Sequence, residues 1–195
     1  MAIKTPPATL PIKRIQWTLK QPHQVNRSGW TGRRQVLTTP GGSLWTCSAE
    51  FIPIVTQAEA KKWIGFFHSV EGQVHSFPVI AVEGPQHGGV NPTVTSGAAG
   101  ASSAVLSANI SALGLGDRMT FKLTDNTYQL VTLTAAMSGT TVNFKPALRN
   151  AAATGVGSVE TVEPFAVVAL AEDAWSYSVD AGQQYGFAFT AEEAF

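Results

Sequence analysis

Histidine, cysteine and carboxylate side chains are the groups from which a catalytic or metal site would be built, and their spacing here does not form one. Neither His-x-x-x-His, His-x-His nor Glu-x-x-His occurs among the four histidines, which are His23, His68, His75 and His87. The single cysteine, Cys47, cannot complete a zinc site and is interpreted as a small core side chain. We therefore expect no bound metal and no cofactor.

Adjacent carboxylates occur twice in the acidic C-terminal part, at Glu172-Asp173 and at Glu192-Glu193. Two catalytic carboxylates must face one site, whereas adjacent residues of a strand point to opposite faces. We interpret both pairs as solvated charges that oppose aggregation or lie at an interface. The motifs Gly-x-Ser-x-Gly and Gly-x-x-x-x-Gly-Lys are also missing from the sequence. The sequence therefore predicts no catalytic residue and no enzymatic activity.

Three aromatic residues are candidates for stacking on a sugar ring: Trp30, Trp175 and Tyr128. Trp30 stands in a glycine-flanked turn, a position from which an indole ring can reach a ligand. Loop tryptophans are more often buried as anchors, so this pattern favours a structural role over sugar binding. A carbohydrate-binding module that recognises a receptor is kept as an alternative function.

The charges are balanced in number but segregated along the chain. Thirteen Lys and Arg match thirteen Asp and Glu, which argues against a surface built to neutralise phosphates, so we expect no specific nucleic-acid partner. Seven of the basic residues precede the first acid, Glu50, and no Lys or Arg follows Arg149. The two ends either neutralise each other inside one fold, or belong to opposite faces that meet head to tail in an assembly.

The sequence shows no segment that would insert into or cross a membrane. Its start lacks the apolar stretch of a secretory signal, and no run of about 18 apolar residues occurs. A single cysteine also excludes any disulfide within the chain. We expect a soluble protein that is made in the cytoplasm and has no membrane partner.

The first part of the chain is predicted to be a β-sheet with one packed helix. Prolines make the first dozen residues an extended arm. Apolar and polar residues alternate over residues 12–20 and 44–52, which is typical of half-buried strands. Apolar residues recur at helical spacing over residues 56–70, where Thr56 and Glu59 form a capping box. Further strands are expected at residues 24–27, 34–38 and 73–82.

A second unit is predicted to be inserted into the first. At residues 83–89 the composition shifts to glycine, alanine, serine and threonine, and short β-rich runs separated by turns follow, which suggests a small barrel. Their ranges are 104–107, 118–123, 128–134 and 141–144. Strands at residues 165–170, 175–179 and 185–189 then complete the first sheet. The predicted fold is mainly β, with a first domain formed by residues 1–84 and 164–195 and an inserted domain formed by residues 85–163.

Six stretches, in order along nearly the whole chain, carry a resemblance. In the first part they are residues 28–36 (Ser-Gly-Trp-Thr-Gly-Arg-Arg-Gln-Val), 40–45 (Pro-Gly-Gly-Ser-Leu-Trp), and 66–73 (Phe-Phe-His-Ser-Val-Glu-Gly-Gln) followed by Phe77. In the second part they are residues 116–119 (Gly-Asp-Arg-Met), 128–131 (Tyr-Gln-Leu-Val) and 142–149 (Val-Asn-Phe-Lys-Pro-Ala-Leu-Arg). Together they resemble the distal tail proteins of long-tailed bacteriophages.

The resemblance implies a structural virion protein of the tail tip, or baseplate hub, without catalysis. Such a protein forms a homo-oligomeric ring, typically a hexamer, that connects the tail tube to the tip and its fibres, with DNA passing through the lumen. It also implies a tail-tube-like β-sandwich with one flanking helix, and an inserted barrel resembling the oligonucleotide/oligosaccharide-binding fold. In such a ring, Arg33 and Arg34 are candidate interface donors and Glu192 and Glu193 candidate acceptors. Another tail component, such as a tube or terminator subunit, is the nearest alternative.

Overall fold

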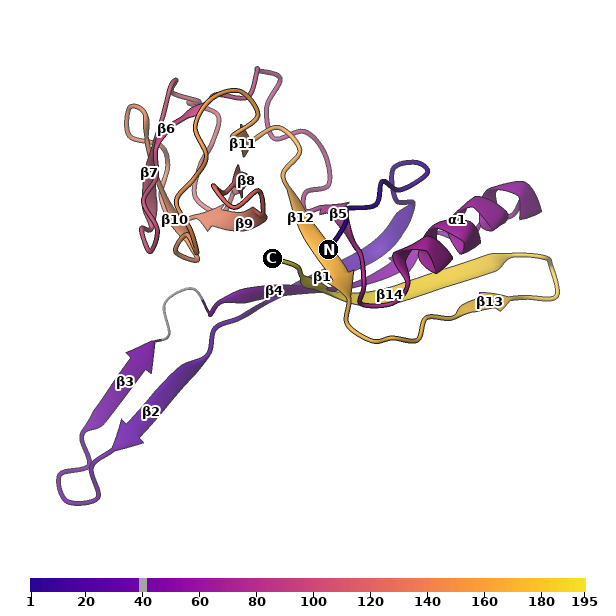
Figure 1. Ribbon diagram of the computed structural model, residues 1–195, viewed down its shortest axis with the longest axis horizontal. Coiled ribbons are helices and arrows are strands. Elements are labelled where there is room, and N and C mark those ends of the chain that lie inside the picture. The colour runs from indigo at the N-terminus through magenta and orange to yellow at the C-terminus, as the bar shows by residue number, and fades with distance from the viewer. Residues whose placement is uncertain (39–41) are drawn as a thin grey trace.

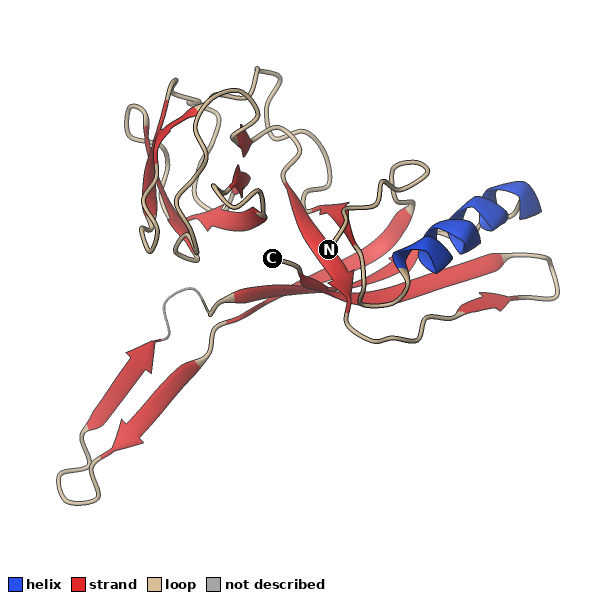
Figure 2. Cartoon of the chain, viewed as in Figure 1, coloured by secondary structure: helices blue, strands red, loops and turns tan. Residues whose placement is uncertain are grey.

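The computed structural model describes residues 1–38 and 42–195, and it is mainly β: one helix accompanies strands in three antiparallel sheets (Figures 1 and 2). The predicted fold class is confirmed at this level. Residues 40 and 41, which belong to the 40–45 stretch that carries the resemblance, lie outside the described residues. The elements are β1 (Ile12–Lys20), β2 (His23–Arg27), β3 (Arg34–Thr38), β4 (Leu44–Phe51), α1 (Gln57–Val70), β5 (Ser76–Ile80), β6 (Val94–Ser96), β7 (Ser103–Leu106), β8 (Arg118–Lys122), β9 (Tyr128–Leu133), β10 (Thr141–Lys145), β11 (Val159–Glu160), β12 (Phe165–Leu170), β13 (Tyr177–Val179) and β14 (Tyr185–Glu193).

The first sheet has the strand order β1-β4-β14-β12-β5, and β13 pairs with β14. Alternation along β4 buries Trp45, Cys47, Ala49 and Phe51, as predicted for this strand. β12 lies in the interior of the sheet, between β14 and β5, which suits a strand whose residues are all apolar. The C-terminal strands therefore complete the sheet that the N-terminal strands begin.

Helix α1 packs on one face of this sheet through an aromatic cluster. Its buried residues Trp63 and Phe67 contact Phe51 of β4, with ring centroids 5.1 and 6.1 Å apart. The predicted capping box is wrong, because Thr56 makes no side-chain hydrogen bond to the first turn. The helix ends at Val70, where the following Glu71 takes a left-handed conformation and its amide donates to the carbonyl of His68.

β2 and β3 form a separate two-stranded hairpin that extends β1 and β4 away from the body of the molecule (Figure 1). Both strands were predicted. Every residue of β2 and residues 34–37 of β3 are exposed. These residues therefore contribute no buried side chain to either core.

The second sheet is a curled half-barrel with the order β11-β8-β9-β10-β7-β6. All of its strands lie between β5 and β12 in the chain, the region of the predicted insertion. Bridges from Val94 to Gly155 and from Leu123 to Ala152 tie the 151–157 segment across its open side. The short strands β6 and β11 were not predicted, because two or three residues give no readable alternation. The exact boundaries of the inserted domain stay a prediction.

The inserted unit and helix α1 lie on the same side of the first sheet, with the N-terminal arm between them (Figure 2). The arm is extended and bonds to the edge of β5, where the amide of Lys4 donates to the carbonyl of Ser76 at 2.7 Å. The strand predicted over residues 73–82 is shorter than expected and begins at Ser76.

Cys47 is expected to resist alkylation in the folded protein. Burial raises the pKa of its thiol from 9.0 to about 12, partly opposed by a hydrogen bond with the backbone of Ala191. Only the thiolate is nucleophilic, so at pH 8 the native chain should react very slowly with a maleimide or aromatic disulfide reagent, and the unfolded chain rapidly. Because the folded state holds this proton up to about pH 12, stability should fall as pH rises above 9. Rapid native labelling at pH 8 would contradict the buried position.

Candidate interaction surfaces

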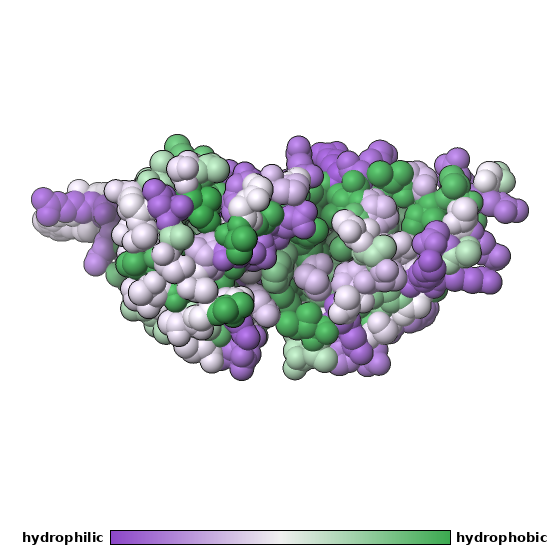
Figure 3. Space-filling view, turned by 90° about the horizontal axis from the view of Figure 1, so that it is seen from above, coloured by the Kyte–Doolittle hydropathy of each residue, from purple (hydrophilic) through white to green (hydrophobic). Residues whose placement is uncertain are grey.

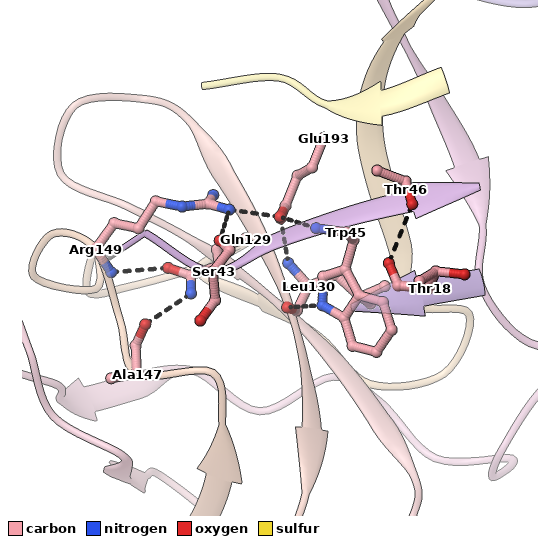
Figure 4. Close-up of polar contacts among 9 residues, drawn as sticks. All are labelled: Thr18, Ser43, Trp45, Thr46, Gln129, Leu130, Ala147, Arg149 and Glu193. Carbon is pink, nitrogen blue, oxygen red and sulfur yellow. Dashed lines mark hydrogen bonds and ion pairs between the residues drawn. The ribbon is translucent and has the colours of Figure 1, made fainter. Parts of the chain in front are cut away.

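A buried ion pair joins the inserted unit to the first sheet. The Glu193 side chain is fully buried at the end of β14, and one of its oxygens accepts from Nη2 of Arg149 at 2.5 Å. The same oxygen accepts the backbone N–H of Trp45 at 3.3 Å, and the other oxygen accepts that of Leu130 at 3.1 Å (Figure 4). One carboxylate thus satisfies donors from β4, from β9 and from the loop after β10.

Arg149 makes further contacts at this junction through its side chain and its backbone. Its Nη2 also donates to the carbonyl of Ser43, and its backbone N–H donates to the side chain of Gln129. Its guanidinium lies 4.0 Å from the ring centroid of Phe195. Since the other two side-chain nitrogens find no partner in the described chain, the Glu193 carboxylate is the group that compensates its charge.

A second arginine of the inserted unit reinforces the same junction. The Arg118 guanidinium lies 5.4 and 5.3 Å from the ring centroids of Trp17 and Trp45 and donates to the carbonyl of Ala81. Burial lowers the pKa of Arg118 from its usual value. The indole of Trp45 in turn donates to the carbonyl of Leu130 at 2.9 Å. These contacts dock the two units as one body.

The expectation that Glu193 is a solvated charge is therefore wrong. Phe187, Phe189, Ala191 and Glu193 follow one another at alternate positions of β14, so Glu193 faces the interior. This signal was present in the sequence, but the strand was predicted to end at Phe189. With its hydrogen bonds taken inside the chain, the Glu193 carboxylate has no exposed surface to offer a neighbouring subunit.

Glu192, on the opposite face of β14, pairs with Lys20 of β1 at 2.7 Å and stays partly exposed. This pair confirms that acids of the C-terminal part neutralise bases of the N-terminal part, at least here. Arg33 and Arg34 lie far from both carboxylates, on the projecting hairpin, and are exposed. The structure does not bring the four predicted interface residues together within one chain.

The three candidate sugar-stacking residues also lie apart. Trp30, at the hairpin turn, is 97% exposed. Trp175 is half-buried against the end of α1, with its ring 5.3 Å from Phe67 and 5.8 Å from Tyr177, and it borders a hollow of about 230 Å³. Tyr128 is half-buried and packs on Phe165, 5.4 Å between ring centroids. No common stacking platform results among the described residues.

The charges of the hairpin are arranged unfavourably for an isolated chain. Arg27 of β2 stands directly opposite Arg34 of β3, and Arg33 lies at the end of the turn, just before Arg34. Like charges at directly opposed positions of a strand pair destabilise it. No Asp or Glu occurs before Glu50 to relieve this repulsion locally.

An apolar groove of about 730 Å³ runs between the N-terminal arm, the β5 and β12 strands and the inserted unit. In Figure 3, apolar surface lies in the hollow between the two lobes of the molecule. Ile3 and Leu10 of the arm, Ile80, Phe165 and Glu163 are among its lining residues. Sequence patterns gave no sign of this groove, because its walls come from four separate segments.

The first sheet leaves one face without a helix and one edge without a strand in the described chain. β1 pairs only with β4, so its outer edge is open. Over β5 and β12 the face opposite α1 carries apolar residues such as Ile80 and Val167. Over β1, β4 and β14 this face is polar, and we call this part of it the polar face. It is formed by Arg14, Gln16, Thr18 and Lys20 of β1, Thr46, Ser48 and Glu50 of β4, and Ala188, Thr190 and Glu192 of β14.

Within residues 1–38 and 42–195, no three His, Cys, Asp or Glu side chains are placed to hold a metal ion. No helix in the same ranges is both long and apolar enough to cross a membrane. The sequence matches no protein-family model and no curated protein.

Proposed function

We propose that this chain is a structural virion protein that forms a ring, of about six copies, at the distal end of a bacteriophage tail. The ring would connect the tail tube to the tip and its fibres, and DNA would pass through its lumen. The observation that carries the proposal is the first sheet, which has a polar face without a helix and an open β1 edge.

An open edge of nine residues is a template for pairing with another chain, and native proteins cover such edges or charge them. Pairing of β1 with a neighbouring copy would join sheets side by side and remove the edge. The polar face would then line the inside of the ring, where it would stay in contact with water. The helix and the inserted unit, both on the other side, would lie outside.

The two units would then correspond to two known architectures. The helix-backed first unit would correspond to a tail-tube-like β-sandwich, and the curled half-barrel to a barrel of the oligonucleotide/oligosaccharide-binding type. The inserted unit favours a hub over a tube or terminator subunit, because a platform on the outside of the ring can hold fibres. The Arg149–Glu193 ion pair and the stacking of Arg118 on Trp45 attach this unit to the first sheet.

A carbohydrate-binding module is the second candidate, favoured by the exposed indole of Trp30. It predicts a monomer that binds glycans, with binding lost in Trp30→Ala. A glycan array without hits would count against it.

The test of the ring is the native mass of the purified protein. We expect light scattering after size exclusion to give a mass of about six chains, and negative-stain images to show rings with an open centre. A monomer at every protein concentration and at both low and high salt would contradict the proposal.

A further inference from the structure

The hairpin tip, formed by residues 27–34, is a projection that its own chain does not support. A two-stranded hairpin alone is marginally stable in water. Here it also carries the opposed pair Arg27 and Arg34 and an indole, Trp30, that is 97% exposed. A large exposed aromatic ring flanked by arginines has the composition of a binding hot spot.

The groove beside the N-terminal arm complements the hairpin tip, because it is apolar and acidic where the tip is aromatic and basic. Its floor is apolar and includes Ile80 and Phe165, and its volume of about 730 Å³ is in the range of sites that enclose an organic group. Two carboxylates, Glu160 and Glu163, lie along it, and neither Lys nor Arg is among its lining residues. In the described chain Glu163 forms no ion pair, and Glu160 accepts from Asn91 at 2.6 Å and from two backbone amides.

We propose that the hairpin tip of one copy docks into this groove of the next copy, with Trp30 on the apolar floor and the arginines beside Glu160 and Glu163. This inference rests on the proposed function, because it names a second contact between neighbours in the ring, in addition to the pairing of β1. The occupant is a second copy because the tip supplies an apolar ring and positive charge together, matching a groove that is apolar and acidic. The hairpin points away from its own body, so it does not fill its own groove (Figure 1).

The contact would be heterologous, since tip and groove are different surfaces of one chain. Such contacts form a closed ring when the rotation between neighbours closes. Docking would also place carboxylates beside Arg27 and Arg34 and so relieve their mutual repulsion.

Cysteine cross-linking tests this contact in the full-length protein. Gly29→Cys places a thiol beside Trp30, at a position with open space around the added Cβ, and Thr9→Cys places one at the exposed rim of the groove. The native Cys47 is buried and does not compete. A chain carrying both changes, treated with a short bis-maleimide, should give a ladder of cross-linked species up to the size of the ring.

Control samples make the result specific. Each single variant alone should give no cross-link, whereas their mixture after reassembly should give dimers. Leu115→Cys, an exposed apolar position outside tip and groove, should give none with Thr9→Cys. Adding Trp30→Ala to the double-cysteine chain should lower the cross-linked fraction about tenfold, because it removes the apolar anchor.

The possible results separate this inference from the proposed function. A ring of the expected mass without the ladder overturns the tip-to-groove contact and leaves the proposed function intact. Dimers from Gly29→Cys alone would show a tip-to-tip contact and overturn it, as would a groove thiol that stays fully reactive in the assembled ring. A protein that never assembles contradicts both.

Discussion

Replacement of Glu193 by alanine is expected to lower the free energy of unfolding by about 3–5 kcal/mol, the effect of breaking a buried ion pair by removing one partner. The change leaves the Arg149 guanidinium buried without its counter-charge and removes the acceptor of the Trp45 and Leu130 amides. Because these groups belong to both units, the near-ultraviolet circular dichroism, to which Trp45 contributes, should change with the loss of docking.

Urea unfolding of the wild type and two adjacent variants measures this effect. Glu192→Ala is the matched control, since Glu192 is partly exposed and pairs with Lys20 at the surface, where an ion pair contributes about 0–1 kcal/mol. We expect a large shift of the urea midpoint for Glu193→Ala and a small one for Glu192→Ala. Equal shifts would mean that the buried junction adds nothing to the stability of the chain.

Reversal of charge on the hairpin is expected to dissociate the ring into smaller species. Arg34→Glu places a carboxylate directly opposite Arg27, which turns a repulsive cross-strand pair into an attractive one. The free hairpin should therefore be at least as well ordered as in the wild type. Loss of assembly would then report the lost interaction with the neighbouring copy and not an unfolded hairpin. Arg33→Glu should act in the same direction.

Lys61→Glu is the control for net charge, because Lys61 is exposed on α1 and the change in charge is the same. Light scattering at low and high salt should show smaller particles for Arg34→Glu and unchanged particles for Lys61→Glu. If both variants assembled like the wild type, the hairpin arginines would have no part in the interface.

Local patterns in the sequence were sufficient to predict most of the elements. Alternation placed β1 and β4 correctly, and the spacing of Trp63, Phe67 and Val70 predicted the buried side of α1. Each of these elements has one buried and one exposed side, so its apolar residues recur every two residues in a strand or every 3.6 residues in a helix. A single segment is enough to show that period. The strand predicted at residues 185–189 is shorter than β14, which continues to Glu193.

Long-range relations could not be predicted in this way. The charge of Glu193 and that of Arg149 are separated by 44 residues, so alternation along β14 shows which way Glu193 faces but not that Arg149 compensates its charge. The groove likewise exists only because the arm, two strands and the inserted unit come together. Trp175, Tyr128 and Trp30 looked equivalent as aromatic residues, and packing alone separated the exposed one from the two half-buried ones.

The sequence by itself determined a mainly β chain with one helix, an inserted β-rich unit, a basic N-terminal part and an acidic C-terminal part. Only the tertiary structure decided which charged side chains are paired inside the chain and which stay exposed, where a partner can contact them. The physical reason is that the free energy of a charge depends on its surroundings, which segments distant in the sequence supply. Those segments bury Glu193 against Arg149 and leave Arg33 and Arg34 in water.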